Sequence, residues 1–257
     1  MTRLRWLALE LFTPIALIAL WWWRSSGSKA PYFPPLSAIV SDFRAIYIWH
    51  GLRTDVAYSL GHFAVGFAFG VSLGFVTGVV LGLSARVRRN VAPVTEFFRA
   101  MPIVAIIPIG LVMVGPGLIL EAGLIALGST WAVMLNTADG VRGVDPIVVE
   151  TARSYGLTRA QQLRTIIVPA AMPQVLAGVR VAVGLGVTVM IVANMFVSTE
   201  GLGAQVAIAQ ETFQIKDAWA GILMIAIVGI AITAVYTVIH NRLLAWHRGW
   251  RASAVTR

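Results

Sequence analysis

Residues 56–83 read VAYSLGHFAVGFAFGVSLGFVTGVVLGL and contain no Asp, Glu, Lys or Arg. A helix needs roughly 20 such residues to cross the hydrocarbon core of a membrane, which is about 30 Å thick. Other mainly apolar runs cover about residues 6–23, 97–114, 118–137, 173–197 and 218–240. The sequence therefore predicts an all-α polytopic membrane protein with about six transmembrane helices.

The composition fits this class. The chain has 257 residues, is 58% hydrophobic and 12% charged, and contains no cysteine, which excludes disulfides and thiolate metal sites. Its net charge of +9 is a feature of many nucleic-acid-binding proteins. However, nearly all basic residues lie in the connections between apolar runs, where Lys and Arg set the orientation of helices in a bilayer. We therefore interpret the charge as membrane topology rather than nucleic-acid binding.

The Lys and Arg residues divide unequally between the two sides of this topology. The side that contains both termini and the connection at residues 138–172 has the larger share, which includes Arg86, Arg88 and Arg89. Cytoplasmic connections carry an excess of Lys and Arg. Both termini and residues 138–172 are therefore expected in the cytoplasm.

The chain is expected to divide into three regions. Residues 1–54 would form a transmembrane anchor and a proline-bearing extracytoplasmic arm with a short surface helix. Residues 55–245 would form the membrane core, and residues 246–257 a basic cytoplasmic tail. The alternative for residues 6–23, a cleaved signal peptide, is disfavoured by Glu10 and by the bulky Trp21–Trp23 end. Whether this first helix reaches the centre of the bundle or only anchors the chain stays open.

The 56–83 segment carries a glycine at every fourth position. A four-residue spacing places the side chains on one stripe of a helix, and small residues there let another helix approach closely. The stripe predicts either a sliding surface or static helix packing, and it consists of Gly66, Gly70, Gly74, Gly78 and Gly82.

A polar segment, VVETARSYGLTRAQQLRTIIVP at residues 148–169, interrupts the apolar pattern. Local signals predict two short helices. Asp145 and Pro146 suit the N-cap and first position of the first helix, and Gly156 suits its end. Thr158 starts a capping box with Gln161, three residues later, and the second helix is expected to stop at Pro169.

The first of these helices is amphipathic. Ile147, Val148, Thr151 and Tyr155 can share one face, which predicts docking into a groove on another protein. The alternatives are a helix lying on the lipid surface and a DNA-binding helix. The segment lacks Trp and Phe and carries both signs of charge, which disfavours the lipid-surface helix. It also lacks the second DNA-contacting element of a binding domain, which disfavours the DNA-binding helix.

The segment ETARSYGLTRAQQLRTIIVPAAMP, residues 150–173, resembles the cytoplasmic EAA signature of permease subunits of ATP-binding-cassette (ABC) importers. That signature reads E-A-A, three residues, G, about nine residues, then I-x-x-P. The matching positions are Glu150, Ala152, Gly156, Ile166 and Pro169, while Thr151 replaces the usual first alanine. The segments FRAMPIVAIIPIGLVMVG (98–115), LNTADGVRGVDP (135–146), PAAMPQVLAGVRVAVG (169–184) and GLGAQVAIAQ (201–210) resemble the branch that imports nitrate, sulfonates and taurine. The resemblance covers about residues 50–250.

This resemblance implies a type I ABC importer permease-like fold in the inner membrane of a bacterium. It implies a substrate that is a small organic or inorganic anion, such as a sulfonate or nitrate, or a small heterocycle. It also implies two ATPase subunits that bind ATP and Mg, an extracytoplasmic binding protein that docks near residues 198–203, and a second permease copy, identical or different. The implied ATPase-coupling loop comprises Asp145, Glu150, Thr151, Ala152, Arg153, Gly156, Ile166 and Pro169.

Polar residues inside apolar spans are candidates for the translocation path, because the bilayer otherwise penalises them. They are His62, Ser72, Asn136, Thr188 and Asn194, and Met101 and Met195 are candidates for an adaptable constriction. Asn194 stands where relatives commonly carry Glu, in the tripeptide ANM. It is expected either to line the path or to bond a neighbouring helix.

No function as an enzyme is expected. The chain contains no G-x-x-x-x-G-K-[ST] loop and no credible nucleophile–base or metal constellation, so it should bind no cofactor. The alternatives are a stand-alone secondary transporter or channel, or a membrane scaffold. Internal repeats are not convincing and intramembrane carboxylates are scarce, which disfavours a proton-coupled transporter.

Overall fold

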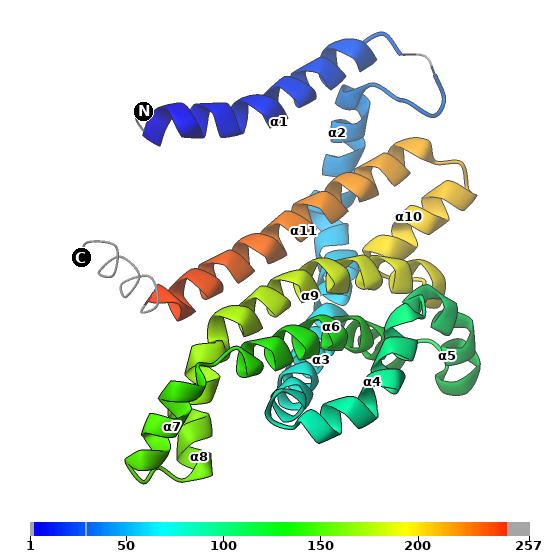
Figure 1. Ribbon diagram of the computed structural model, residues 1–257. Coiled ribbons are helices and arrows are strands. Elements are labelled where there is room, and N and C mark those ends of the chain that lie inside the picture. The colour runs from blue at the N-terminus through cyan, green and yellow to red at the C-terminus, as the bar shows by residue number, and fades with distance from the viewer. Residues whose placement is uncertain (1–2, 29, 246–257) are drawn as a thin grey trace.

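The computed structural model describes residues 3–28 and 30–245, apart from the side chains of residues 3–11, 49 and 50. The described part is all-helical (Figure 1). The expected basic tail at residues 246–257 lies outside the described residues.

The chain begins with α1 (Arg3–Ser25), which contains the first expected span. After a connection, α2 (Leu36–Ile46) continues without a break through the π-helix η1 (Tyr47–Val56) into α3 (Ala57–Leu83). The segment expected to form a separate short surface helix is helical, but it is the beginning of this continuous helix, and the expected division at residues 54 and 55 lies inside η1. Tyr47 is 1% exposed, and burial raises its pKa to about 12, with further increases from Asp55 and Asp217. It therefore stays uncharged at neutral pH.

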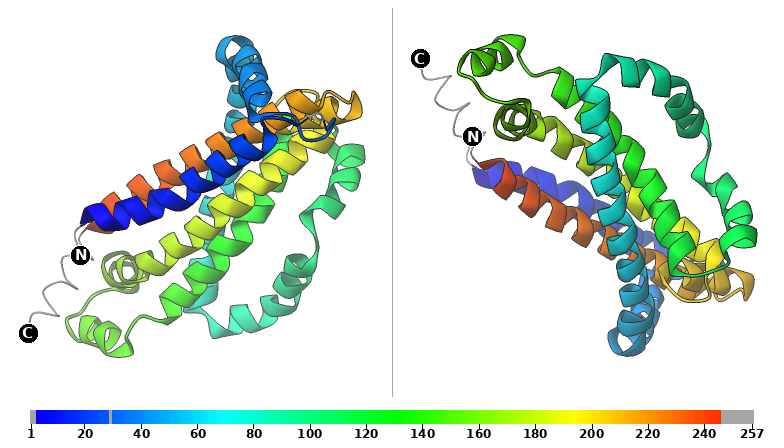
Figure 2. Two further views of the ribbon diagram at one scale, coloured as in Figure 1. Left: turned by 90° about the horizontal axis from the view of Figure 1, so that it is seen from above. Right: turned by 90° about the horizontal axis from the view of Figure 1, so that it is seen from below.

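The third expected span, residues 97–114, is not one continuous helix. α4 (Ala85–Ala100) is followed by the 3₁₀ turn η2 (Ile103–Ile106) and α5 (Ile107–Val114), and the two parts are bent by 87°. Pro102 explains the break, because its ring disfavours helical backbone at the preceding residue. Met101 is accordingly extended, with φ −79° and ψ 124°. As a result α4 and α5 bow away from the rest of the bundle (Figure 2).

The fourth expected span is α6 (Leu118–Arg142), which leads into α7 (Pro146–Ser154) and α8 (Arg159–Gln162). The prediction that Pro169 ends the second loop helix is wrong. α8 passes directly into the π-helix η3 (Leu163–Ile167) and then into α9 (Val168–Val197), so Pro169 lies in the first turn of α9. At the start of a helix, proline removes no essential hydrogen bond. The bond that the N–H of Val168 makes to Leu163, five residues back, replaces the normal pattern just before it.

The chain continues through α10 (Leu202–Glu211) and α11 (Ile215–Leu243). Four helical stretches are long and apolar enough to cross a membrane within the described range, namely Gly51–Leu83, Leu118–Arg142, Arg159–Val197 and Ile215–Leu243. The bent α4–α5 pair is a fifth candidate, and α1, with 23 residues, matches the first expected span. By length and hydropathy the described helices therefore supply four or five of the about six expected spans, and α1 occupies the place of the first.

α6 is the central helix. It packs against α3 on one side and α9 on another, and its residues Glu121, Ile125, Ser129, Val133 and Thr137 are 0% exposed. The glycine stripe of α3 faces it. A Cβ added to Gly66, Gly70 or Gly78 would lie 2.5–2.6 Å from a carbonyl oxygen of α6, which is closer than real carbon atoms come. The stripe therefore lets the two backbones touch.

The two ends of the bundle differ in what they contain. The start of α1, the end of α11 and the α7–α8 loop lie at one end (Figure 1). α10 and the α1–α2 connection lie at the other end. This arrangement agrees with the topology that the distribution of Lys and Arg predicts.

Candidate functional site

The loop between α6 and α9 has the local structure that its sequence predicts. The N–H of Ile147 donates to Oδ1 of Asp145 over 2.9 Å, and Pro146 occupies the first position of α7. Gly156 has φ +77°, the left-handed conformation that disfavours any residue with a Cβ. Thr158 and Gln161 form the expected capping box. These contacts hold α7 at a defined angle to α8.

α7 presents an apolar face to its surroundings. Ile147 is 71% and Tyr155 81% exposed. They line a groove of about 340 Å³ together with Val148, Thr151, Ala152, Leu157 and Ile166. Exposed apolar surface of this kind, rimmed by polar residues, is typical of a protein–protein contact. The groove brings together three residues of the expected coupling loop, which are Thr151, Ala152 and Ile166.

Two charged residues of the expected coupling loop lie beside this face. Glu150 and Arg153 are exposed, and within the described part of the chain neither takes part in an ion pair. Both side chains can therefore meet charges on a partner. At such a surface, complementary charge mainly controls encounter rate and partner choice.

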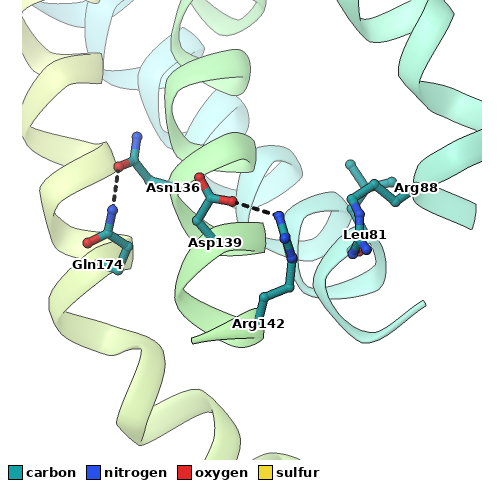
Figure 3. A network of polar contacts seen from close by, with 6 residues as sticks. All are labelled: Leu81, Arg88, Asn136, Asp139, Arg142 and Gln174. Atoms are coloured by element: carbon teal, nitrogen blue, oxygen red, sulfur yellow. Dashed lines mark hydrogen bonds and ion pairs between the residues drawn. The ribbon is translucent and has the colours of Figure 1, made fainter. Parts of the chain in front are cut away.

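The base of the loop is tied together by polar contacts between helices (Figure 3). Nε2 of Gln174 on α9 donates to Oδ1 of Asn136 on α6 over 3.1 Å. One turn further along α6, Arg142 contacts Asp139 over 3.3 Å. Arg88 on α4 donates to the carbonyl of Leu81 on α3 over 3.1 Å. The contact between Asn136 and Gln174 joins α6, which enters the loop, to α9, which leaves it. The Arg142–Asp139 pair lies within α6, and the Arg88 bond joins α4 to α3.

The polar candidates for the path fall into different surroundings. Ser72 and Thr188 are exposed, and their hydroxyls donate to carbonyls one turn back, at Ala68 and Gly184. Met101 lies at the break between α4 and η2 and, like Met195, is partly buried. Asn136 is engaged at the base of the loop. The structure therefore does not gather these candidates into one site.

Asn194 belongs to a separate set of contacts, at the end of the bundle opposite the α7–α8 loop. It is 0% exposed. Its Nδ2 donates to Oε2 of Glu121 over 2.5 Å, and its Oδ1 accepts from the hydroxyl of Ser59 over 2.6 Å. In this structure Asn194 bonds neighbouring helices and has no surface on a path.

The carboxyl group of Glu121 is the centre of this set. Its Oε1 accepts from the hydroxyl of Tyr58 over 2.9 Å, and the oxygen of Tyr58 accepts from Ser198 over 2.9 Å. We call these five residues the outer cluster: Tyr58, Ser59, Glu121, Asn194 and Ser198. His62 lies beside it, with its ring 4.0 Å from that of Tyr58 and its Nδ1 2.9 Å from the carbonyl oxygen of Tyr58.

The outer cluster also holds the segment between α9 and α10. The N–H of Leu202 donates to Oγ of Ser59 over 2.9 Å, and the N–H of Glu200 donates to Oγ of Ser198 over 3.1 Å. Gly201 has φ +99°, and an added Cβ would lie 2.9 Å from both Oδ1 of Asn194 and Oγ of Ser59. Only glycine fits this position without displacing the cluster.

Of the outer cluster, the sequence predicted only Asn194 as a polar candidate, together with His62 beside the cluster. The signal for Glu121 was present, because an acidic residue inside an apolar run needs a partner in the membrane. Its partner could not be read from the sequence, since Glu121 and Asn194 are 73 positions apart. Within the described residues, no group of three or more His, Asp or Glu side chains is arranged to hold a metal ion.

Comparisons with known proteins agree on one family. Residues 70–246 match the family model described as binding-protein-dependent transport system inner membrane component. The chain is 30% identical to SsuC of Bacillus subtilis (strain 168), named as an aliphatic sulfonates transport permease protein, over 93% of this chain and 88% of that protein. It is 29% identical to the taurine transport system permease protein TauC of Escherichia coli (strain K12), over 95% and 94% of the two chains.

Solved structures with the same fold include the MetNI methionine ABC transporter in an inward-facing conformation. Its matching chain has a TM-score of 0.63 and 20% identity, with 76% of this chain and 97% of that chain covered. A chain of an amino acid ABC transporter matches with a TM-score of 0.56, also at 20% identity, over 80% and 94% of the two chains. At this level of identity the likeness establishes the fold.

Proposed function

Since the chain belongs to the family of inner membrane components of binding-protein-dependent transport systems, we propose that it forms the path by which an ATP-driven importer moves a small anion across the membrane. The chain is a permease subunit of the ABC importer class. It lies in the inner membrane as a multi-pass helical protein, and we assign both termini to the cytoplasmic side.

We assign the ATPase contact to α7. The single observation that carries this assignment is the apolar face of α7, which is exposed in this chain. The helix that carries this face is capped and lies in the segment that resembles the EAA signature. An amphipathic helix of this kind binds by laying its apolar face into a groove of the partner. Glu150 and Arg153 would then meet charges at the rim of that groove, and Gly156 would set the angle of the helix.

The loop is well placed to transmit force. α6 enters it and α9 leaves it, and these two helices are packed together along the bundle and joined by Asn136 and Gln174. Movement of an ATPase subunit against α7 would therefore move α6 and α9 together. Rigid-body rotation of packed helices is a common way to switch between two states.

The proposed assembly contains two permease copies, two ATPase subunits and one binding protein. ATP and Mg would be held by the ATPase subunits, because this chain has no phosphate-binding loop. The binding protein would dock at the opposite end, on the segment around residues 198–202 and α10. Two identical permeases related by a two-fold axis are the simplest arrangement, since most oligomers are symmetric.

The proposed substrate is a small organic or inorganic anion. The support is the names of the relatives, which are permeases for aliphatic sulfonates, taurine and, for CmpB of Synechococcus elongatus, bicarbonate. Of the polar candidates, we assign Ser72 and Thr188 to the path, because their hydroxyls are exposed, and Met101, because it lies at the α4–η2 break.

The test is purification of the complex from native membranes after treatment with vanadate, which traps an ATPase in one state. Mass spectrometry of the purified complex should identify a chain that contains a G-x-x-x-x-G-K-[ST] loop, and the complex purified without vanadate should hydrolyse ATP. Ile147→Asp should reduce the recovery of that ATPase by roughly tenfold or more, because it places a charge in the apolar contact. Thr165→Ala, in the same loop but outside the groove, is the matched control.

Two results would contradict the proposal. One is equal recovery of the ATPase with Ile147→Asp and Thr165→Ala. The other is transport by the purified chain alone in vesicles without ATP, which would support a stand-alone transporter.

A further inference from the structure

The outer cluster joins three elements that are distant in the sequence. Tyr58 and Ser59 belong to α3, Glu121 belongs to α6, and Asn194 lies near the end of α9. Glu121, Ser59 and Asn194 are each 0% exposed. A carboxyl group buried to this degree within a membrane helix is costly, and such groups mark functional positions more often than simple packing.

The hydrogen bonds of the cluster all run toward Glu121. Ser198 donates to Tyr58, Tyr58 donates to Glu121, and the amide of Asn194 donates to the other oxygen of Glu121. Glu121 is therefore an acceptor on both oxygens. An amide at this position would place its NH2 group against the hydroxyl of Tyr58 or the NH2 group of Asn194, and both of these are donors. The cluster therefore suits a carboxyl group whose two oxygens only accept.

The cluster connects the outer segment at residues 198–202 with the coupling loop. Ser198 and Leu202 are bonded to Tyr58 and Ser59 on α3. Glu121 and Asn194 join α6 to α9 at the outer end, and Asn136 and Gln174 join the same two helices at the loop end. The unit formed by α6, the loop and α9 is therefore tied at both ends, with the outer segment attached at one and α7 at the other.

The outer segment also has surface available for a partner. Thr199 and Glu200 are exposed, whereas Gly201 and Leu202 are buried against the cluster. A protein that docks on Thr199 and Glu200 would therefore act on a segment whose neighbouring residues are bonded into the helix bundle.

We propose that Glu121 is a positioning residue that transmits docking of the binding protein on residues 198–202 to the α6–loop–α9 unit, and thereby raises the rate of the partner ATPase. This inference rests on the proposed function. Docking shifts the outer segment, the bonds through Tyr58 and Asn194 carry that shift to α6 and α9, and α7 moves with them. The coupling is a free energy shared between two sites, as in other allosteric systems.

The test uses the complete transporter in lipid nanodiscs, prepared without vanadate from this chain together with the ATPase and the binding protein that mass spectrometry identifies in the native complex. The measured quantity is the ratio of the ATPase rate with saturating binding protein to the basal rate without it. Glu121→Gln should lower this ratio roughly tenfold, because it places an amide donor against Tyr58 or Asn194 and hydrogen bonds to a carboxylate each contribute about that factor. The basal rate and the recovery of the complex show whether the variant is assembled.

A transposed variant separates transmission from simple stability. Asn194→Asp alone places two carboxylates together and should also lower the ratio. The double variant Glu121→Gln with Asn194→Asp keeps the length of both side chains and provides a partner for every bond, because the amide on α6 then accepts from Tyr58 and donates to the carboxylate on α9, which also accepts from Ser59. We expect it to return the ratio to within about twofold of the original protein, as coupled neighbours do in double-mutant cycles.

Ser129→Ala is the matched control, since Ser129 is also 0% exposed on α6 but its hydroxyl has no hydrogen-bond partner among the described residues. It should leave the ratio unchanged. An unchanged ratio in Glu121→Gln, or a transposed variant that assembles normally but stays unresponsive, would overturn the role of Glu121. If the original complex is not stimulated at all, the proposed function itself is wrong, and the role of Glu121 falls with it.

Discussion

Gly70 and Gly61 lie on the same helix, α3, but only Gly70 faces another helix. A Cβ added to Gly70 would lie 2.6 Å from the carbonyl oxygen of Ala126, whereas one added to Gly61 would meet nothing within 4 Å. Gly70→Ala should therefore destabilise the protein by about 1–3 kcal/mol through overpacking. Gly61→Ala should stabilise it by about 0.5–1 kcal/mol, because alanine favours a helix.

Thermal unfolding of the detergent-purified chain measures both changes. Opposite shifts of the midpoint are expected for the two alanine variants. Equal shifts would mean that α3 and α6 are not in close contact at the glycine stripe.

Buried hydroxyls on the central helices also differ in a testable way. Within residues 3–28 and 30–245, Ser129 and Thr137 are buried without a hydrogen-bond partner, whereas Ser59 both donates to Asn194 and accepts from Leu202. An unsatisfied buried hydroxyl costs about 1–3 kcal/mol, so Ser129→Ala should leave the unfolding midpoint equal or higher. Ser59→Ala should lower it, since it leaves two groups unpaired. A lower midpoint for Ser129→Ala would show that its hydroxyl has a partner.

At the scale of the elements, the shape of the α7–α8 loop depends more on Gly156 than on Pro169. Gly156 has φ +77°, so Gly156→Ala introduces strain of about 1–2 kcal/mol at the turn that sets the angle of α7. Pro169 lies in the first turn of α9, where proline and alanine are both accepted, so Pro169→Ala should change little. Gly156→Ala should therefore weaken recovery of the ATPase several times more than Pro169→Ala does. The reverse order would mean that Pro169 controls the shape of the loop.

The break at Pro102 is a second feature at this scale. It turns an apolar run of spanning length into two helical pieces at 87° and leaves Met101 at the corner. α3 is held tightly against the central helix α6 by the glycine stripe, whereas α4 and α5 bow away from it (Figure 2).

At the scale of the whole molecule, the orientation can be measured directly because the chain has no cysteine. Thr199 and Thr165 are both exposed, and they lie beyond the opposite ends of α9, since Thr165 belongs to η3 and Thr199 follows Val197. With the proposed topology, Thr199→Cys should react with a membrane-impermeant maleimide in cells whose outer barrier is open and inner membrane intact. Thr165→Cys should react only after the inner membrane is permeabilised. Labelling in the opposite order would reverse the orientation inferred from Lys and Arg.

The sequence by itself determined the features that depend on a few neighbouring residues or on the length of an apolar run. The spans follow from the thickness of the bilayer, and the caps at Asp145 and Thr158 and the turn at Gly156 follow from contacts within about four residues. The family signature lies in the same short segment. Apart from the third span, which is broken at Pro102, these predictions agree with the structure because the physical cause and the residues that supply it are adjacent in the chain.

The tertiary structure alone decided which distant residues meet. Glu121 and Asn194 are each recognisable as polar groups in apolar runs, but only the packing of α6 against α9 makes one the partner of the other. The same holds for Pro102 and Pro169. The span is broken at Pro102, whereas the helix runs on through Pro169. The difference depends on whether the surrounding helix can shift its hydrogen bonds, as η3 does just before Pro169. Such choices are set by the free energy of the packed bundle, which no short segment contains.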